Sequence, residues 1–239
     1  MSELRTALAD ALGPLYRIER EVRPVGEYRL FVATQSENGT ELLVKVLPAA
    51  LSLGIDDLQF ERAVLLVAER LQHANLVRPR GAGRAGSFVY HTRPFVPGTT
   101  LRAWIGNNGP IPLARTVDIL RGVLNGLAHA HAAGIAHGEL KAENVLLADA
   151  GVLVADTGIA AALGKPASPR NDMAAVQSLS YEMLTGLRPT TGQEPLERTR
   201  TLPIWLTEWM RSRWTDAGRA LAGMRPPPPS SSQSSQLFA

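Results

Sequence analysis

The most informative stretch of this chain is HGELKAENVLL, residues 137–147. It places an acid, a base and an amide on one short loop, at Glu139, Lys141 and Asn144, and the acid precedes the amide by five residues. The apolar residues that follow the amide predict a buried strand directly after the loop. A polar turn between a helix and a strand would account for this loop if it stood alone.

A second polar motif follows twelve residues after Asn144. Residues 152–155, VLVA, predict another short buried strand, and this strand runs into Asp156-Thr157-Gly158. Two such motifs in this order argue against an accidental pair of turns.

Together the two motifs resemble the catalytic loop and the metal-binding motif of protein kinases, H-R-D-x-K-x-x-N and D-F-G. The resemblance implies that Glu139 stands for the catalytic aspartate and that Lys141 steadies the transferred phosphate. It also implies that Asn144 and Asp156 hold magnesium. Gly138 stands where the family pattern has arginine.

The amino-terminal third predicts a helix over residues 3–12 and then strands over 16–22, 28–33 and 42–47, because apolar and polar residues alternate in each strand. By the same resemblance, Lys45 in the third strand contacts the α- and β-phosphates of ATP.

The turn between the first two strands departs from the family pattern. Its three glycine positions hold Arg23, Val25 and Tyr28, and Gly26 is the only glycine nearby. We expect such a loop to sit higher or to collapse inward, because only bare backbone closes over phosphates. The grip on a nucleotide is then weakened.

Residues 56–72 predict one amphipathic helix. In the family this helix carries a glutamate that pairs with the strand lysine. That position falls on Val64, or on Ala63 with one inserted residue, whereas Glu61 lies about one turn too early. Whether Glu61 still faces Lys45 stays open.

Residues 76–79 and 87–91 predict the last two strands, and residues 92–98 resemble the hinge between the kinase lobes. The resemblance implies that the Pro94 carbonyl and the Val96 N–H read adenine. Arg93 precedes them, and its long cationic side chain is expected to crowd or fill the adenine pocket.

The carboxy-terminal part predicts helices from residue 101 and over 112–133, and a further helix that begins at Asp172. The resemblance implies that Asp172 binds the catalytic-loop backbone. Only residues 159–171 separate this helix from Gly158, so the activation segment is expected to be truncated and the peptide platform missing. We expect the large-lobe face beside residues 159–171, which includes Ile159 and Leu163, to be an exposed docking surface for another protein or another copy of this chain.

The end of the chain resembles a shortened version of the last kinase helices over 201–224. Residues 225–239 are rich in proline, serine and glutamine, and this composition predicts a disordered tail.

Three histidines, His129, His131 and His137, suggest a metal site, but no carboxylate or cysteine stands at ligand spacing on the same helix face. The resemblance accounts for His131 and His137 as packing positions.

Composition narrows the class further. Hydrophobic residues make up 45% and charged residues 20%, which is typical of a folded globular protein. The net charge of +3 is not gathered into a basic block, so we expect no nucleic-acid partner. The absence of cysteine excludes disulfides. No apolar run approaches about 18 residues, and we expect a cytoplasmic protein without a membrane partner.

The sequence therefore predicts an α+β, bilobal protein-kinase-like fold, with a small antiparallel β lobe carrying one helix and a larger, mainly helical lobe. We expect an N-terminal extension over 1–15, the small lobe over 16–96, the shortened large lobe over 97–224, and the tail.

The predicted function is that of a pseudokinase that binds ATP and Mg²⁺ weakly or not at all and acts through protein interaction. Two alternatives stay open. One is a slow serine/threonine protein kinase that uses Glu139 as its base. The other is an aminoglycoside-type small-molecule phosphotransferase, because such enzymes carry an H-G-D motif that residues 137–139 echo.

Overall fold

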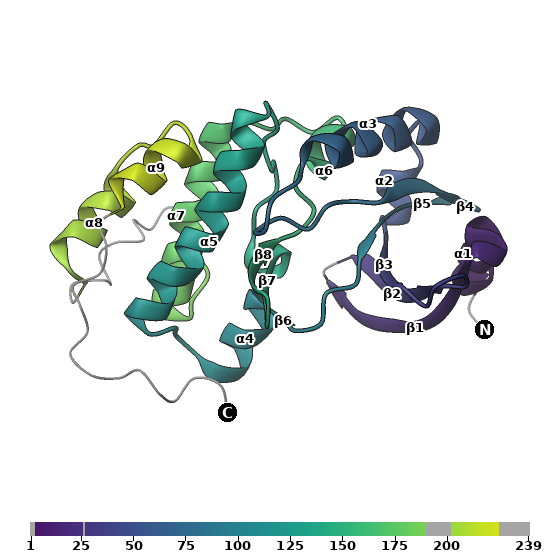
Figure 1. Ribbon diagram of the computed structural model, residues 1–239, viewed down its shortest axis with the longest axis horizontal. Coiled ribbons are helices and arrows are strands. Elements are labelled where there is room, and N and C mark those ends of the chain that lie inside the picture. The colour runs from purple at the N-terminus through teal and green to yellow at the C-terminus, as the bar shows by residue number, and fades with distance from the viewer. Residues whose placement is uncertain (1–2, 26, 190–201, 225–239) are drawn as a thin grey trace.

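The computed structural model describes residues 3–25, 27–189 and 202–224. The chain folds into a small lobe built on an antiparallel sheet and a larger lobe made mainly of helices (Figure 1). The predicted α+β, bilobal fold is confirmed. The tail over 225–239 and Gly26 lie outside the described residues.

The small lobe contains a five-stranded sheet in the order β1-β2-β3-β5-β4, and all of its neighbouring strands are antiparallel. The strands are β1 (Tyr16–Val25), β2 (Tyr28–Gln35), β3 (Glu41–Val46), β4 (Gly81–Ala85) and β5 (Phe88–Pro94). The first three confirm the predicted strands.

Two helices flank this sheet on different sides. Helix α1 (Glu3–Leu12) buries Leu4 and Leu8 against apolar strand residues such as Phe31. Helix α3 (Asp57–Arg70) begins where the Asp56 side chain accepts from the N–H of Gln59 at 3.0 Å, a typical N-cap. One turn of helix, α2 (Ala49–Ser52), precedes it.

One predicted strand is wrong. Residues 76–79 form no named strand, and only Leu76 makes an isolated bridge, to Val154. The fourth strand lies instead at Gly81–Ala85, where the sequence GAGRA lacks β-branched residues and so gives no strand signal.

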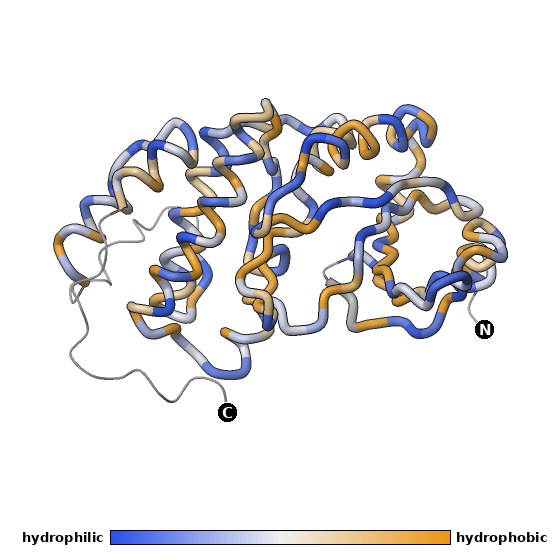
Figure 2. The backbone as a smooth tube through the Cα atoms, viewed as in Figure 1, coloured by the Kyte–Doolittle hydropathy of each residue, from blue (hydrophilic) through white to orange (hydrophobic). Residues whose placement is uncertain are grey.

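The large lobe is organised around helix α5 (Leu113–Ala132), which buries ten of its residues. Its other helices are α4 (Leu101–Asn108), α6 (Ile159–Ala162), α7 (Pro169–Thr185), α8 (Ile204–Arg211) and α9 (Ala217–Gly223). A small sheet contains β6 (Thr99–Thr100), β7 (Val145–Ala148) and β8 (Gly151–Val154). Two 3₁₀ turns complete the elements of the described residues, η1 (Gly13–Leu15) in the small lobe and η2 (Ala142–Asn144) in the large lobe. Orange and blue alternate within the long helices in Figure 2, as expected of helices that bury one side.

Helix α7 begins earlier than predicted. Pro169 is its first residue, and the Ser168 hydroxyl caps it by accepting from the N–H of Asn171 at 3.2 Å. The Ser-Pro pair is a stronger helix start than Asp172, because proline is favoured in the first turn. The segment between Gly158 and α7 is therefore residues 159–168.

That segment joins the two lobes. Ile159 is 5% exposed and packs with Phe60 and Val64 of α3, and Leu163 packs against the same cluster. Ile159 is buried beside α3 and does not line an exposed docking surface, contrary to the expectation for this residue, whereas Leu163 is half-buried. No helix among the described residues is long and apolar enough to cross a membrane.

Candidate nucleotide and catalytic site

Asp172 binds the backbone of the loop that begins at His137. Its carboxylate accepts from the backbone N–H groups of His137 and Gly138 at 2.7 and 2.9 Å, as the resemblance predicts. The Nε2 atom of His131 lies 2.8 Å from the same carboxylate, and the Nε2 atom of His137 lies 3.0 Å from the Ala155 carbonyl. Both histidines therefore bind protein groups and fix the loop.

Gly138 allows the segment over 159–168 to lie directly on the loop. Its φ is +82°, and a Cβ atom there would stand 2.8 Å from the Cβ of Ala160 and 2.9 Å from that of Ala167. An arginine in this place, as in the family pattern, would push the segment away. The glycine and the close-packed segment belong together.

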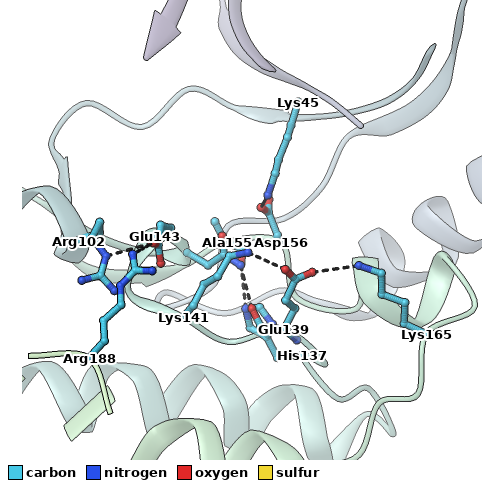
Figure 3. Close-up of polar contacts among 11 residues, drawn as sticks. Lys45, Arg102, His137, Glu139, Lys141, Glu143, Ala155, Asp156, Lys165 and Arg188 are labelled. Atoms are coloured by element: carbon cyan, nitrogen blue, oxygen red, sulfur yellow. Dashed lines mark hydrogen bonds and ion pairs between the residues drawn. The ribbon is translucent and has the colours of Figure 1, made fainter. Parts of the chain in front are cut away.

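Glu139, the predicted base, is bound by two lysines (Figure 3). The Lys141 ammonium lies 2.6 Å from one of its carboxylate oxygens and Lys165 lies 3.5 Å from the other. Burial raises the pKa of Glu139, but the hydrogen bond and charge of Lys141, with Lys165, lower it further than burial raises it. Glu139 is therefore ionised, and both of its oxygens face cations.

Asn144, a predicted metal ligand, is buried and braces the loop. Its amide nitrogen donates to the Glu139 carbonyl at 3.0 Å. The side-chain oxygen of Asn144 is the atom that remains for a metal.

Lys45 and Asp156 meet directly across the lobes (Figure 3). The Lys45 ammonium lies 2.6 Å from Oδ2 of Asp156, and the two side chains are 8% and 9% exposed. Asp156 has a φ of +64°, and no other non-glycine residue in the described part of the chain has a positive φ. The predicted phosphate contact and the predicted metal ligand thus bind each other.

Arg93 adds a second cation to Asp156. Its Nε lies 3.6 Å from Oδ1 of Asp156, and its Nη1 donates to the Pro94 carbonyl at 3.2 Å. Burial raises the pKa of Asp156, but its cationic neighbours, Lys45 first, hold that pKa well below its ordinary value. His91 lies beside them, and burial lowers its pKa to about 4, so it is neutral at pH 7.

Tyr28, the first residue of β2, lines the cavity from the small lobe. Its ring centroid lies 4.5 Å from the Lys45 ammonium and 5.8 Å from that of Lys141, a cation–π arrangement. Burial raises the pKa of Tyr28 to about 12, and the charge of Glu139 adds to this effect. A side chain at this glycine position does turn inward, as the sequence suggested.

Glu61 does not replace the family's helix glutamate. Within the described residues it makes no ion pair with Lys45, and Val64 at the family position is fully buried. The only acid bound to Lys45 in this part of the chain is Asp156.

The remaining space is small. A cavity of about 10 Å³ is lined by Tyr28, Lys45, Leu47, His91, Glu139, Asn144, Asp156, Ile159, Ala160 and Leu163. This is room for about one water molecule. The carboxylate and amide oxygens suit Mg²⁺, and the cavity itself is much smaller than a nucleotide. Of the predicted adenine contacts, the Pro94 carbonyl is bound by Arg93, and Val96 packs beside Val77, Leu146 and Ala155.

Similarity to known proteins defines the class of this protein. The protein kinase domain family matches residues 29–193, and the chain belongs to this family. Among its relatives, the serine/threonine-protein kinase PknL of Mycobacterium tuberculosis is 34% identical in an alignment 152 residues long that covers 53% of this chain and 38% of that protein. A probable serine/threonine-protein kinase PknB of Lactococcus lactis is 30% identical in an alignment 206 residues long that covers 74% of this chain and 32% of the relative.

The family membership is therefore of the bacterial serine/threonine type. The chain spans about a third of the length of the curated relatives it matches. The PknI kinase domain of Mycobacterium tuberculosis has a similar structure, with a TM-score of 0.72 at 18% identity over 88% of this chain and 95% of that one. This likeness supports the fold alone.

Sequence reasoning missed two residues of the site, Lys165, which binds Glu139, and His91, which lines the cavity. The strand register contains a signal for the second: Lys45 pairs with His91 and Leu43 with Arg93, so strand alternation puts both β5 side chains on the Lys45 face. Lys165 stands in an irregular segment, and no periodicity points to it.

Proposed function

We propose that this chain is a pseudokinase that acts through protein interaction. The observation that carries the proposal is the direct ion pair of Lys45 with Asp156. Phosphoryl transfer depends on positioning and charge neutralisation, with a lysine on the phosphates and an aspartate on magnesium. Here the two groups neutralise each other, and Tyr28 and Arg93 close around them.

The state of Glu139 supports the same proposal. A general base must reach the proton that it accepts, yet both Glu139 oxygens face lysines, and Lys165 reaches it from the segment that lies over the loop. The segment over 159–168, shorter than a kinase activation segment on our interpretation, leaves no extended platform for a peptide. The proposed role for ATP and Mg²⁺ is therefore weak binding or none.

A nucleotide titration tests this proposal. A ligand at 100 times its Kd stabilises a protein by about 2.7 kcal/mol, so thermal shift with millimolar ATP, with and without magnesium, detects moderate affinity. We expect a small, magnesium-dependent shift or none, and Lys45→Ala should remove any shift. A large shift without magnesium would contradict the proposal.

The slow-kinase alternative has one observation in its favour, because Lys45, Glu139, Asn144 and Asp156 all line one cavity. Labelled ATP decides between the two. We expect no phosphate incorporation into the protein or a generic substrate. Robust incorporation that Glu139→Gln abolishes would make the chain an active kinase.

Another protein or a second copy of this chain is the proposed partner. Leu58, Leu65 and Leu66 of α3 are 63, 43 and 54% exposed, and exposed apolar side chains that gather on one element suggest a contact site. Light scattering tests self-association: if a second copy binds here, Leu65→Asp lowers the mass, while Leu15→Asp, at a 65% exposed position outside α3, serves as the charged control.

A further inference from the structure

Arg93 touches both ends of the predicted nucleotide site. Register pairing of β3 with β5 puts Arg93 on the sheet face of Lys45, which is the face toward the large lobe. From there its guanidinium donates to the Pro94 carbonyl at 3.2 Å and approaches Oδ1 of Asp156 at 3.6 Å. One side chain thus spans from the hinge to the metal-binding carboxylate.

The chemistry of the guanidinium matches what a magnesium–nucleotide would bring. It offers N–H donors to a hinge carbonyl, as an adenine amino group would, and a positive charge to the carboxylate, as a magnesium ion would. Asp156 carries one negative charge against the two positive charges of Lys45 and Arg93. A dication brought to this carboxylate meets two buried cations, and their repulsion is strong where water is excluded.

Arg93 also lies where a base would need space. Its side chain is 11% exposed, and the apolar residues on the same sheet face, Leu30, Val32 and Leu43, are buried in a cluster that Phe95 joins. A planar ring placed on this face would therefore meet the Arg93 side chain.

The fit of Arg93 to Asp156 is imperfect. Nε of Arg93 and Oδ1 of Asp156 have no hydrogen-bond partner, and neither does the neighbouring Nδ1 atom of His91. A buried cation that is left without its full set of hydrogen bonds contributes little to stability. Stability therefore does not explain why an arginine stands at this position.

We propose that Arg93 is a specificity-determining residue that excludes magnesium–nucleotide by occupying the hinge carbonyl and the Asp156 carboxylate itself. The inference rests on the proposed pseudokinase function and names the residue that produces it. It predicts that the Lys45, Asn144 and Asp156 side chains still suffice for binding once the guanidinium is gone.

Calorimetric titration with ATP, with magnesium and with a chelator, tests this inference on wild type and Arg93→Met. Methionine keeps the apolar stem and removes the charge. We expect Arg93→Met to bind magnesium–ATP at least tenfold more tightly than wild type, and only with magnesium. Arg93→Lys, which keeps a cation, should remain like wild type, and so should Arg80→Met, which removes an exposed arginine of the same lobe.

The outcomes separate the two proposals. Equally weak binding by wild type and by folded Arg93→Met, with the same result for Arg93→Thr, overturns the role of Arg93 and leaves the pseudokinase proposal standing. Tight magnesium–ATP binding by wild type overturns the pseudokinase proposal and the exclusion with it. Circular dichroism establishes that each variant is folded, and Arg93→Thr replaces Arg93→Met if the latter is not.

Discussion

Among single residues, Asp156 balances the charges of two buried cations. Removing its charge leaves Lys45 and Arg93 without this partner in a site where the three side chains are 8, 11 and 9% exposed for Lys45, Arg93 and Asp156. Breaking a buried pair in this way costs about 3–5 kcal/mol. We expect Asp156→Asn to lower the free energy of unfolding by that order in urea denaturation, whereas Asp149→Asn, at an exposed position, should change it little. Equal effects would show that Asp156 is not the balancing charge.

His91 should make stability depend on pH. Burial lowers its pKa to about 4, whereas an unfolded histidine titrates near 6.5. Between these two values the unfolded chain binds the extra proton, so stability falls as pH decreases from about 6.5 toward 4, by at most about 1.4 kcal/mol for each pH unit.

His91→Phe checks this prediction, because it removes the titrating ring while keeping an aromatic side chain. Lys45, Arg93 and Asp156 lie beside His91, and Asp156 stays ionised throughout this pH window because its pKa is held well below its ordinary value. We expect urea midpoints of the variant to fall less steeply with acid than those of wild type. His137, whose pKa burial also lowers, keeps part of the slope in both proteins. Identical slopes would assign the effect to other groups.

The site residues that the sequence predicted are those with a fixed distance along the chain from a recognisable motif. Lys45, Asn144 and Asp156 all line the cavity, as the resemblance to protein kinases implied. The ion pair between Lys45 and Asp156 was not predicted, because it joins residues 111 positions apart and depends on how the lobes close.

At the scale of elements, the packing of the segment over 159–168 on the catalytic loop gives a prediction for Gly138. Alanine at Gly138 or Gly164 must adopt a positive φ, which costs about 1–2 kcal/mol. Of these two positions, only at Gly138 does the new Cβ also meet neighbours, at 2.8 and 2.9 Å, since a Cβ added at Gly164 meets nothing within 4 Å.

We expect Gly138→Ala to lose about 1–3 kcal/mol more stability than Gly164→Ala, because overpacking adds to the backbone cost. Thermal denaturation of the two variants measures the difference. Limited proteolysis should also cleave the segment over 159–168 faster in Gly138→Ala. Equal stability losses would mean that the segment does not press on the loop.

Element boundaries were predicted well where the local signal is strong and poorly where tertiary pairing decides. Helix α5 ends beside Gly134 as expected, and α1 and β1 begin at the predicted residues. Strand β4 was missed because glycine and alanine form it only through pairing with β5. The start of α7 was misplaced because a serine cap and a proline outweigh an aspartate three residues later.

At the scale of the whole molecule, the two lobes share their packing. The Val154 carbonyl accepts from the N–H of Val77, and the Val154 N–H donates to the carbonyl of Asn75, both at 2.8 Å. Ile159 and Leu163 extend the cluster around Phe60 of α3. These contacts could not be predicted from the sequence, because each joins segments that are far apart along the chain.

Shared packing predicts that the lobes unfold together. All four tryptophans, Trp104, Trp205, Trp209 and Trp214, lie in the large lobe, so their fluorescence reports on that lobe, whereas far-UV ellipticity reports on both. We expect the two signals to give one urea midpoint. Ile159→Ala should lower the free energy of unfolding by about 2–5 kcal/mol, and so lower both midpoints together. Leu187→Ala, which truncates a 48% exposed side chain, should change neither midpoint. Separate midpoints, with ellipticity changing before fluorescence, would mean that the small lobe unfolds alone and that the contacts of Ile159 do not couple the lobes.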